Sequence, residues 1–138
     1  MTPLLRVPVG AALYFGAVFS AGFALGVLRT LWLEPQLGPL AATALELPVM
    51  FGVSWIVARR IGASRFRATR AIESIATGAL AFGMLMAAEL VLSDMMRGTG
   101  LAGFLAHLTS LHGALGLAGQ LVFALIPWLQ FRLAATRP

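Results

Sequence analysis

The sequence contains no cysteine, no lysine and only five acidic residues. These absences limit the kinds of chemical site that the protein can contain. Without cysteine, the chain forms no disulfide bonds, thiolate metal sites or cysteine nucleophiles. Charged residues make up only 11% of the 138 residues, whereas hydrophobic residues make up 59% and the mean hydropathy is +0.90. A water-soluble domain is far less apolar, and we therefore expect an integral membrane protein.

Sequence motifs of common enzymes are also missing. The chain has no G-x-S-x-G, no P-loop and no G-x-G-x-x-G followed by an acidic residue. We therefore expect a protein that is not an enzyme and has no catalytic residues. A net charge of +5 would suggest nucleic-acid binding in a soluble protein, but here the arginines flank apolar segments, and we expect no nucleic-acid partner.

Four apolar segments are each long enough to cross a hydrocarbon core of about 30 Å as a helix. Helices are required because lipid offers no hydrogen bonds to the backbone, and the alternating pattern of barrel strands is missing. We predict an all-α, integral membrane four-helix bundle that forms a single transmembrane domain over residues 1–138. The predicted spans are about 9–30, 37–58, 72–93 and 102–127, and an arginine-rich linker occupies 59–71.

The arginines flank these segments unevenly, which predicts an orientation. On one side lie only Arg29 and Arg97. The other eight lie on the side of the two termini and the linker: Arg6, Arg59, Arg60, Arg65, Arg67, Arg70, Arg132 and Arg137. Because cytoplasmic loops carry the excess of positive charge, we predict that the termini and the linker are cytoplasmic, which is an N-in/C-in arrangement. The tryptophans agree, since each falls at a predicted membrane boundary: Trp32, Trp55 and Trp128.

Small residues recur every fourth position in three of the predicted spans. Such ridges allow helices to approach closely, which matters because packing drives helix association in lipid. Whether they face the same chain or another copy is left open by the sequence. The ridges comprise Gly22 and Gly26; Ala79, Gly83 and Ala87; and Ala106, Ser110, Ala114 and Ala118.

The ionisable residues of the spans gather in the half of the bundle that lies away from the linker. A charged carboxylate inside the membrane costs about 2.5 to 3.5 kcal/mol on insertion scales, so Glu46 should face the bundle interior. Its expected partner is Arg29 on the neighbouring helix. With Glu89 and His112, these two residues form a predicted buried polar pocket in the periplasmic half.

Three further residues are secondary polar candidates: His107, Gln120 and Asp94. We expect Gln120 to form a helix-to-helix hydrogen bond. His107 and His112 lie about 140° apart on an ideal helix, so they do not form a metal pair on one face. A copper site that uses methionine as a soft donor lacks a suitable ligand spacing, and haem would need histidines on more than one span. We therefore expect no metal and no cofactor.

Several segments resemble a known group of proteins: VFSAGFALGVLRTLWLEPQLG, ALELPVMFGVSW, GALAFGMLMAAEL and LAGQLVFALIPWL. They resemble an uncharacterised family of small four-span inner-membrane proteins of proteobacteria. The likeness centres on Arg29, Pro35, Gly38, Glu46, Pro48, Glu89 and Gln120. No activity is assigned to that family, so the resemblance implies only the fold and a multi-pass location in the bacterial inner (cytoplasmic) membrane.

Two functions fit these features. In the first, the protein is a non-enzymatic subunit or scaffold, whose partners are membrane lipid and either a second copy in a homo-oligomer or a larger membrane complex. In the second, it is a small proton- or ion-coupled transporter in which Glu46 and Glu89 alternate between protonated and ionised states. The sequence does not choose between them.

Overall fold

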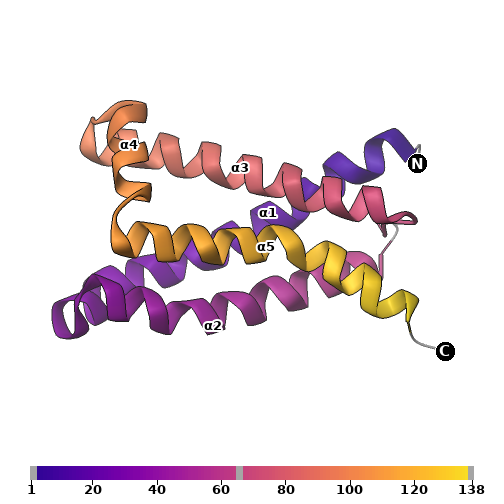
Figure 1. Cartoon of the computed structure of the whole chain (residues 1–138), viewed down its shortest axis with the longest axis horizontal. Coiled ribbons are helices and arrows are strands. Elements are labelled where there is room, and N and C mark those ends of the chain that lie inside the picture. Colours follow the sequence, from indigo (N-terminus) through magenta and orange to yellow (C-terminus); the bar gives the residue numbers. More distant parts are fainter. Residues whose placement is uncertain (1–2, 65–66, 137–138) are drawn as a thin grey trace.

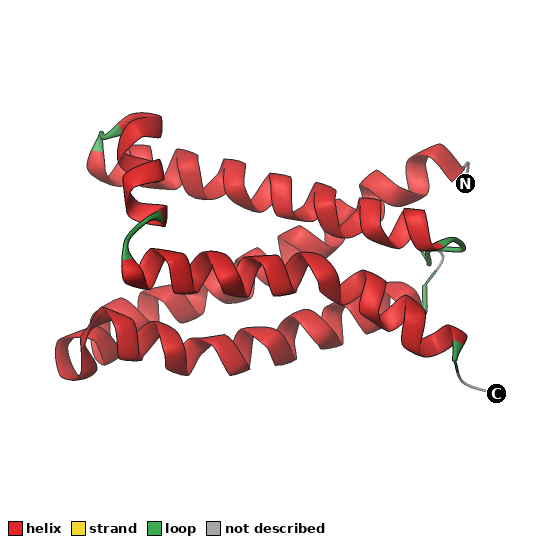
Figure 2. Ribbon diagram, in the orientation of Figure 1, coloured by secondary structure: helices red, strands yellow, loops and turns green. Residues whose placement is uncertain are grey.

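Helices account for almost all of the chain that the computed structural model describes, which is residues 3–64 and 67–136 (Figures 1 and 2). Four helices are long and pack as a bundle, which confirms the predicted all-α fold. In chain order the elements are α1 (Pro3–Leu28), the π-helical turn η1 (Arg29–Leu33), α2 (Glu34–Gly62), α3 (Ala71–Arg97), α4 (Gly100–Leu108) and α5 (Leu111–Ala135). Two arginines used to predict the orientation, Arg65 and Arg137, lie outside the described residues.

Gly38 allows the chain to reverse between the first two long helices. Its φ of 77° and ψ of 163° belong to a region of backbone conformation that is essentially restricted to glycine. Pro35 lies in the first turn of α2, where the missing N–H of proline would have no helical partner in any case. The remainder of α2 therefore runs back against α1 (Figure 1).

The predicted span at 102–127 differs from the structure, because a turn at 109–110 divides it into α4 and α5. Ser110 explains the break. Its Oγ donates to the carbonyl of His107 at 2.6 Å and accepts from the backbone N–H of Gly113 at 3.2 Å, as a helix N-cap does. The short helix α4 lies across the end of the bundle, and α5 continues to Ala135 (Figure 1).

Tyr14 on α1 lies in the buried core and is only 1% exposed. Its ring stacks on that of Phe123 from α5, with the two centroids 4.4 Å apart, and its hydroxyl donates to the backbone carbonyl of Phe123 at 2.8 Å. Ala58 of α2 and Ala81 of α3 belong to the same core. All four long helices therefore contribute to one core.

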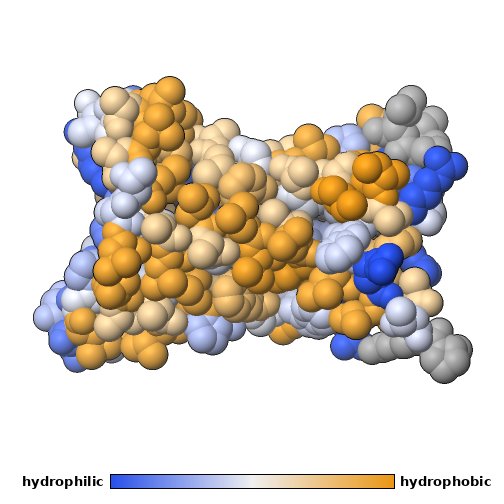
Figure 3. All heavy atoms as spheres, viewed as in Figure 1, coloured by the Kyte–Doolittle hydropathy of each residue, from blue (hydrophilic) through white to orange (hydrophobic). Residues whose placement is uncertain are grey.

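Among the described residues, three stretches are long and apolar enough to cross a membrane: Leu5–Gly62, Ala71–Arg97 and Leu111–Ala135. The first stretch supplies two of the long helices because it reverses at Gly38. On the face shown in Figure 3, hydrophobic residues cover the middle of the bundle and hydrophilic residues gather at its two ends. This distribution is that of a multi-pass membrane protein with contact to lipid around its middle.

Candidate functional site

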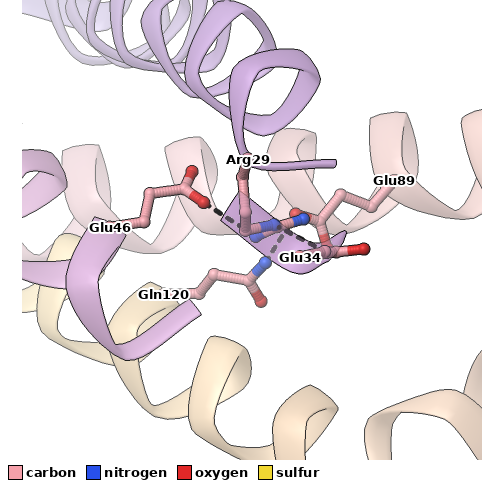
Figure 4. Close-up of polar contacts among 5 residues, drawn as sticks. All are labelled: Arg29, Glu34, Glu46, Glu89 and Gln120. Carbon is pink, nitrogen blue, oxygen red and sulfur yellow. Dashed lines mark hydrogen bonds and ion pairs between the residues drawn. The ribbon is translucent and has the colours of Figure 1, made fainter. Parts of the chain in front are cut away.

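Arg29, the first residue of η1, donates hydrogen bonds to two carboxylates. Its Nη1 lies 2.8 Å from Oε2 of Glu46, and its Nε lies 3.1 Å from Oε1 of Glu34 (Figure 4). The contact between Arg29 and Glu46 that the sequence predicts is therefore present. Because Glu46 belongs to α2, this ion pair joins the two sides of the reversal at Gly38.

Glu34 is a site residue that the sequence analysis does not predict, because it reads as part of a connecting turn. The π-helical turn explains why it reaches Arg29: the backbone N–H of Glu34 donates to the carbonyl of Arg29, five residues earlier. A π-helical turn is held by such bonds between residues five apart, which brings the two side chains to nearly the same side of the turn. On an ordinary α-helix residues five apart lie about 140° apart, so the sequence spacing gives no signal of this contact.

The prediction of a buried Arg/Glu pair is wrong as to burial. The side chains of Arg29 and Glu46 are 28% and 13% exposed, and that of Glu34 is 30% exposed. The position of the residues gives the reason, because the reversal lies at one end of the bundle, where fewer helices surround a side chain (Figure 1). The ion pairs are half-buried.

Glu89 on α3 and Gln120 on α5 form a second polar contact. The amide Nε2 of Gln120 donates to Oε1 of Glu89 at 2.6 Å, which is the helix-to-helix bond expected of this glutamine (Figure 4). Among the described residues, no arginine or histidine forms an ion pair with Glu89. This carboxylate therefore has a neutral partner, whereas Glu34 and Glu46 have a cationic one.

His107 and His112 lie together, and not on different sides of one continuous helix as the predicted angle of about 140° requires. Their ring centroids are 4.9 Å apart and the rings meet edge to face. The angle of 140° holds only for a continuous helix, and the turn at 109–110 brings the two rings together. Nδ1 of His112 lies 3.5 Å from Oγ of Ser110. The hydrogen bond of His112 is therefore to the turn at 109–110 and not to Arg29 or Glu46, the residues with which the sequence predicts that it forms a pocket.

Asp94, a secondary candidate, stabilises the connection between α3 and α4. Its Oδ1 accepts a hydrogen bond from the backbone N–H of Gly100 at 2.8 Å, and its carbonyl accepts one from Gly98 at 2.7 Å. Both glycines have positive φ, 64° at Gly98 and 58° at Gly100, which glycine adopts without steric cost. The contacts of Asp94 are those of a capping residue.

A pocket of about 880 Å³, hereafter the main pocket, lies among all of the helices. Its lining includes the predicted residues Arg29, Glu46, Glu89, His107, His112 and Gln120, but not Asp94. Most of the remaining lining is apolar. The structure thus places the predicted polar residues on one cavity, although they form separate contacts within it.

Among the described residues, no three histidine, aspartate or glutamate side chains lie close enough together to hold a metal ion. His107 and His112 are adjacent, but in the described part of the chain no third ligand of these types completes a site with them. The arrangement is suited to hydrogen bonding and charge pairing within an apolar cavity.

The fold and the site define a class, namely small α-helical multi-pass membrane proteins with a half-buried polar cluster beside an apolar cavity. The chain matches no protein-family model, and neither a curated protein nor a solved structure is significantly similar to it. The resemblance to a four-span family is therefore not supported as such, and the structure supports only the coarser statement that the chain is a small helical membrane protein.

Proposed function

We propose that the protein is a non-enzymatic subunit or scaffold of a complex in the bacterial inner membrane. The observation that carries this proposal is a stripe of small residues on α3 that faces away from the bundle. The stripe consists of Ala79, Gly83 and Ala87, all of which are exposed. A spacing of four residues allows another helix to approach closely, which is how helices associate in lipid.

The contacts of the glycines support this reading. A Cβ at Gly83 would meet no described atom within 4 Å, whereas a Cβ at Gly22 on α1 would lie 3.0 Å from the side chain of Met50. At Gly22, the small-residue ridge of α1 therefore packs against another helix of the same bundle. On α5, Ala114 and Ala118 are exposed, as the stripe on α3 is. Small-residue surfaces therefore remain on the outside of the molecule.

Purification in a mild detergent followed by native mass measurement tests this proposal. We expect the wild-type protein to carry a second copy or a larger partner, and Gly83→Leu to lose it, because the leucine would block the stripe. Gly52→Leu on α2 is a matched control, since Gly52 is also exposed with open space around it but has Pro48 and Ile56 at the neighbouring positions. A lone wild-type monomer, or a complex that survives Gly83→Leu, would contradict the proposal.

The proposed orientation is N-in/C-in. It is supported by the arrangement in Figure 1, where the start of α1, the end of α5 and the connection between α2 and α3 lie at one end of the bundle. Described arginines at that end include Arg6, Arg59 and Arg132, whereas Arg29 and Arg97 lie at the other end. Reporter fusions in the linker at 59–71 test the orientation, and a periplasmic signal would reverse it.

A small proton-coupled transporter is the second candidate, and the pairing of Glu89 favours it. This carboxylate lines the main pocket and, within residues 3–64 and 67–136, has only the neutral Gln120 as its bonded partner. A membrane carboxylate without a cation is suited to taking up a proton. In liposomes, a transporter should show pH-dependent flux that Glu46→Gln abolishes while the fold persists. In a scaffold, the same substitution should reduce assembly or stability.

A further inference from the structure

Three oxygen-bearing groups in the main pocket lack partners that such groups normally have. Ser93 on α3 is only 8% exposed, and its Oγ accepts and donates no hydrogen bond among the described residues. Oε1 of Gln120 is also buried, and no described residue donates a hydrogen bond to it. The carboxylate of Glu89 has a bond to Gln120 but forms no ion pair with any cationic side chain that the structure describes. Buried polar atoms in native proteins are nearly always satisfied, so each exception requires an explanation.

These three groups belong to one small region. Ser93 follows Glu89 by four residues on α3, so their side chains project from the same face of the helix. Gln120 reaches Glu89 from α5 with an N–O distance of 2.6 Å. All three line the main pocket. The pocket therefore contains a group of hydrogen-bond acceptors that includes one carboxylate.

The chemistry of this group selects a ligand with several N–H donors and a positive charge. A carboxylate and an amide oxygen only accept hydrogen bonds, and a serine hydroxyl also accepts them. A primary ammonium provides three donors and no acceptor. Arg29 does not donate to these acceptors, because the hydrogen bonds that it makes are to Glu34 and Glu46.

The volume and the walls of the main pocket indicate the size and polarity of the remainder of the ligand. A volume of about 880 Å³ is that of an organic-ligand site and far exceeds the space that a single ion needs. The walls include the aromatic side chains Phe15, Phe19, Phe51, Phe104 and Phe123. Aromatic faces attract cations and pack against flat apolar groups.

We infer that the main pocket binds a protonated primary amine with an apolar, aromatic body. The ammonium group bonds to Glu89, Ser93 and Gln120, and the body lies against the phenylalanine walls. This inference does not depend on the proposed scaffold function, since a subunit that lost its partner would keep the pocket within its own helices.

The wild-type protein in lipid nanodiscs, titrated with 2-(1-naphthyl)ethylamine in equilibrium dialysis, provides the first test. Empty nanodiscs measure simple partition into lipid. Two analogues with the same body separate the requirements: the trimethylated amine keeps the charge but has no N–H, and 2-(1-naphthyl)ethanol has a hydroxyl without the charge. We expect saturable binding of the amine, and binding of both analogues weaker by roughly tenfold or more, as is typical for a lost charged hydrogen bond.

Three variants make the test specific to the site. Ser93→Ala should weaken amine binding about fivefold to tenfold while leaving the fold equally or more stable, because it removes an unsatisfied buried atom. Glu89→Gln should weaken binding by more than about tenfold. Gly116→Leu should abolish binding by filling the pocket, since Gly116 lines the cavity and a Cβ there meets open space.

Matched controls on α3 use Ser74→Ala and Glu73→Gln. Neither residue lines the main pocket: Oγ of Ser74 donates to the carbonyl of Ala71, and Glu73 accepts hydrogen bonds from Thr69. Both variants should bind the amine as the wild type does. The inference is overturned if the amine only partitions into lipid, if the trimethylated analogue binds equally well, or if folded Ser93→Ala keeps wild-type affinity.

Discussion

The hydroxyl of Tyr14 donates to the backbone carbonyl of Phe123, which is the carbonyl that Pro127 leaves without a helical partner. In an α-helix this carbonyl would accept from the N–H four residues later, but proline has no N–H. A side chain of α1 therefore completes the hydrogen bonding of α5. The same ring stacks on the side chain of Phe123, so one residue supplies both packing and a backbone hydrogen bond.

Tyr14→Phe should lower the free energy of unfolding by about 1 to 3 kcal/mol, because a buried carbonyl is left without a donor. Thermal or denaturant unfolding in mixed micelles measures the loss. The control is a double-mutant cycle with Pro127→Ala, which restores a backbone N–H four residues after Phe123. In that background the cost of Tyr14→Phe should shrink, and an unchanged cost would show that the carbonyl does not depend on the tyrosine.

Arg29→Gln should destabilise the protein more than Glu46→Gln does. Removing the arginine leaves two carboxylates facing each other without a cation, and we expect a loss of about 1 to 3 kcal/mol for these half-buried pairs. Glu46→Gln leaves Arg29 bonded to Glu34 and should cost less than about 1 kcal/mol. Unfolding measurements on both variants and on the double variant test the order, and equal losses would refute it.

Two glycines of α3 should respond in opposite directions to alanine. A Cβ at Gly78 would collide with the backbone carbonyl of Ala124 on α5, so Gly78→Ala should cost about 1 to 3 kcal/mol by forcing the helices apart. At Gly83 the added methyl meets open space, and the higher helix propensity of alanine should stabilise the fold by up to about 1 kcal/mol. Similar effects at both positions would mean that α3 and α5 are not in close contact.

His107 should make the connection between α4 and α5 sensitive to acid. The residue lies outside the three apolar stretches. Burial, Arg97, His112 and Arg29 lower its pKa below the ordinary value of 6.5. As the pH falls through about 6.5, the unfolded chain therefore binds a proton before the folded chain does, and stability decreases. Hydrogen exchange of α4 between pH 7.5 and 5 tests this, and His107→Gln should remove the dependence.

The sequence predicts the helices of this bundle well because lipid permits few alternatives for a long apolar segment. It also predicts the ion pair of Arg29 and Glu46, since charges within apolar spans require partners. The turn at 109–110 is harder to predict, because it depends on one serine that bonds both sides of the break. Its signal is present as a residue with strong N-cap preference, but Ser110 also fits a ridge of small residues.

Ser93 illustrates a different limit. Serine is common in membrane helices, where it usually bonds to its own helix. Ser20 does this, with its Oγ 2.7 Å from the carbonyl of Gly16, and Ser93 does not. Only the packing around a residue determines whether its hydroxyl is satisfied, so a sequence pattern cannot separate the two cases.

The reversal at Gly38 has a consequence for biogenesis. Because α1 and α2 are joined by a short turn, they form a helical hairpin that can insert into the bilayer as one unit. Arg29 and Glu34 lie next to the tip of that hairpin and form an ion pair within one helical turn. In the proposed N-in/C-in orientation this tip is translocated, and it carries its arginine together with a neutralising partner, which lowers the cost of moving charge across the lipid.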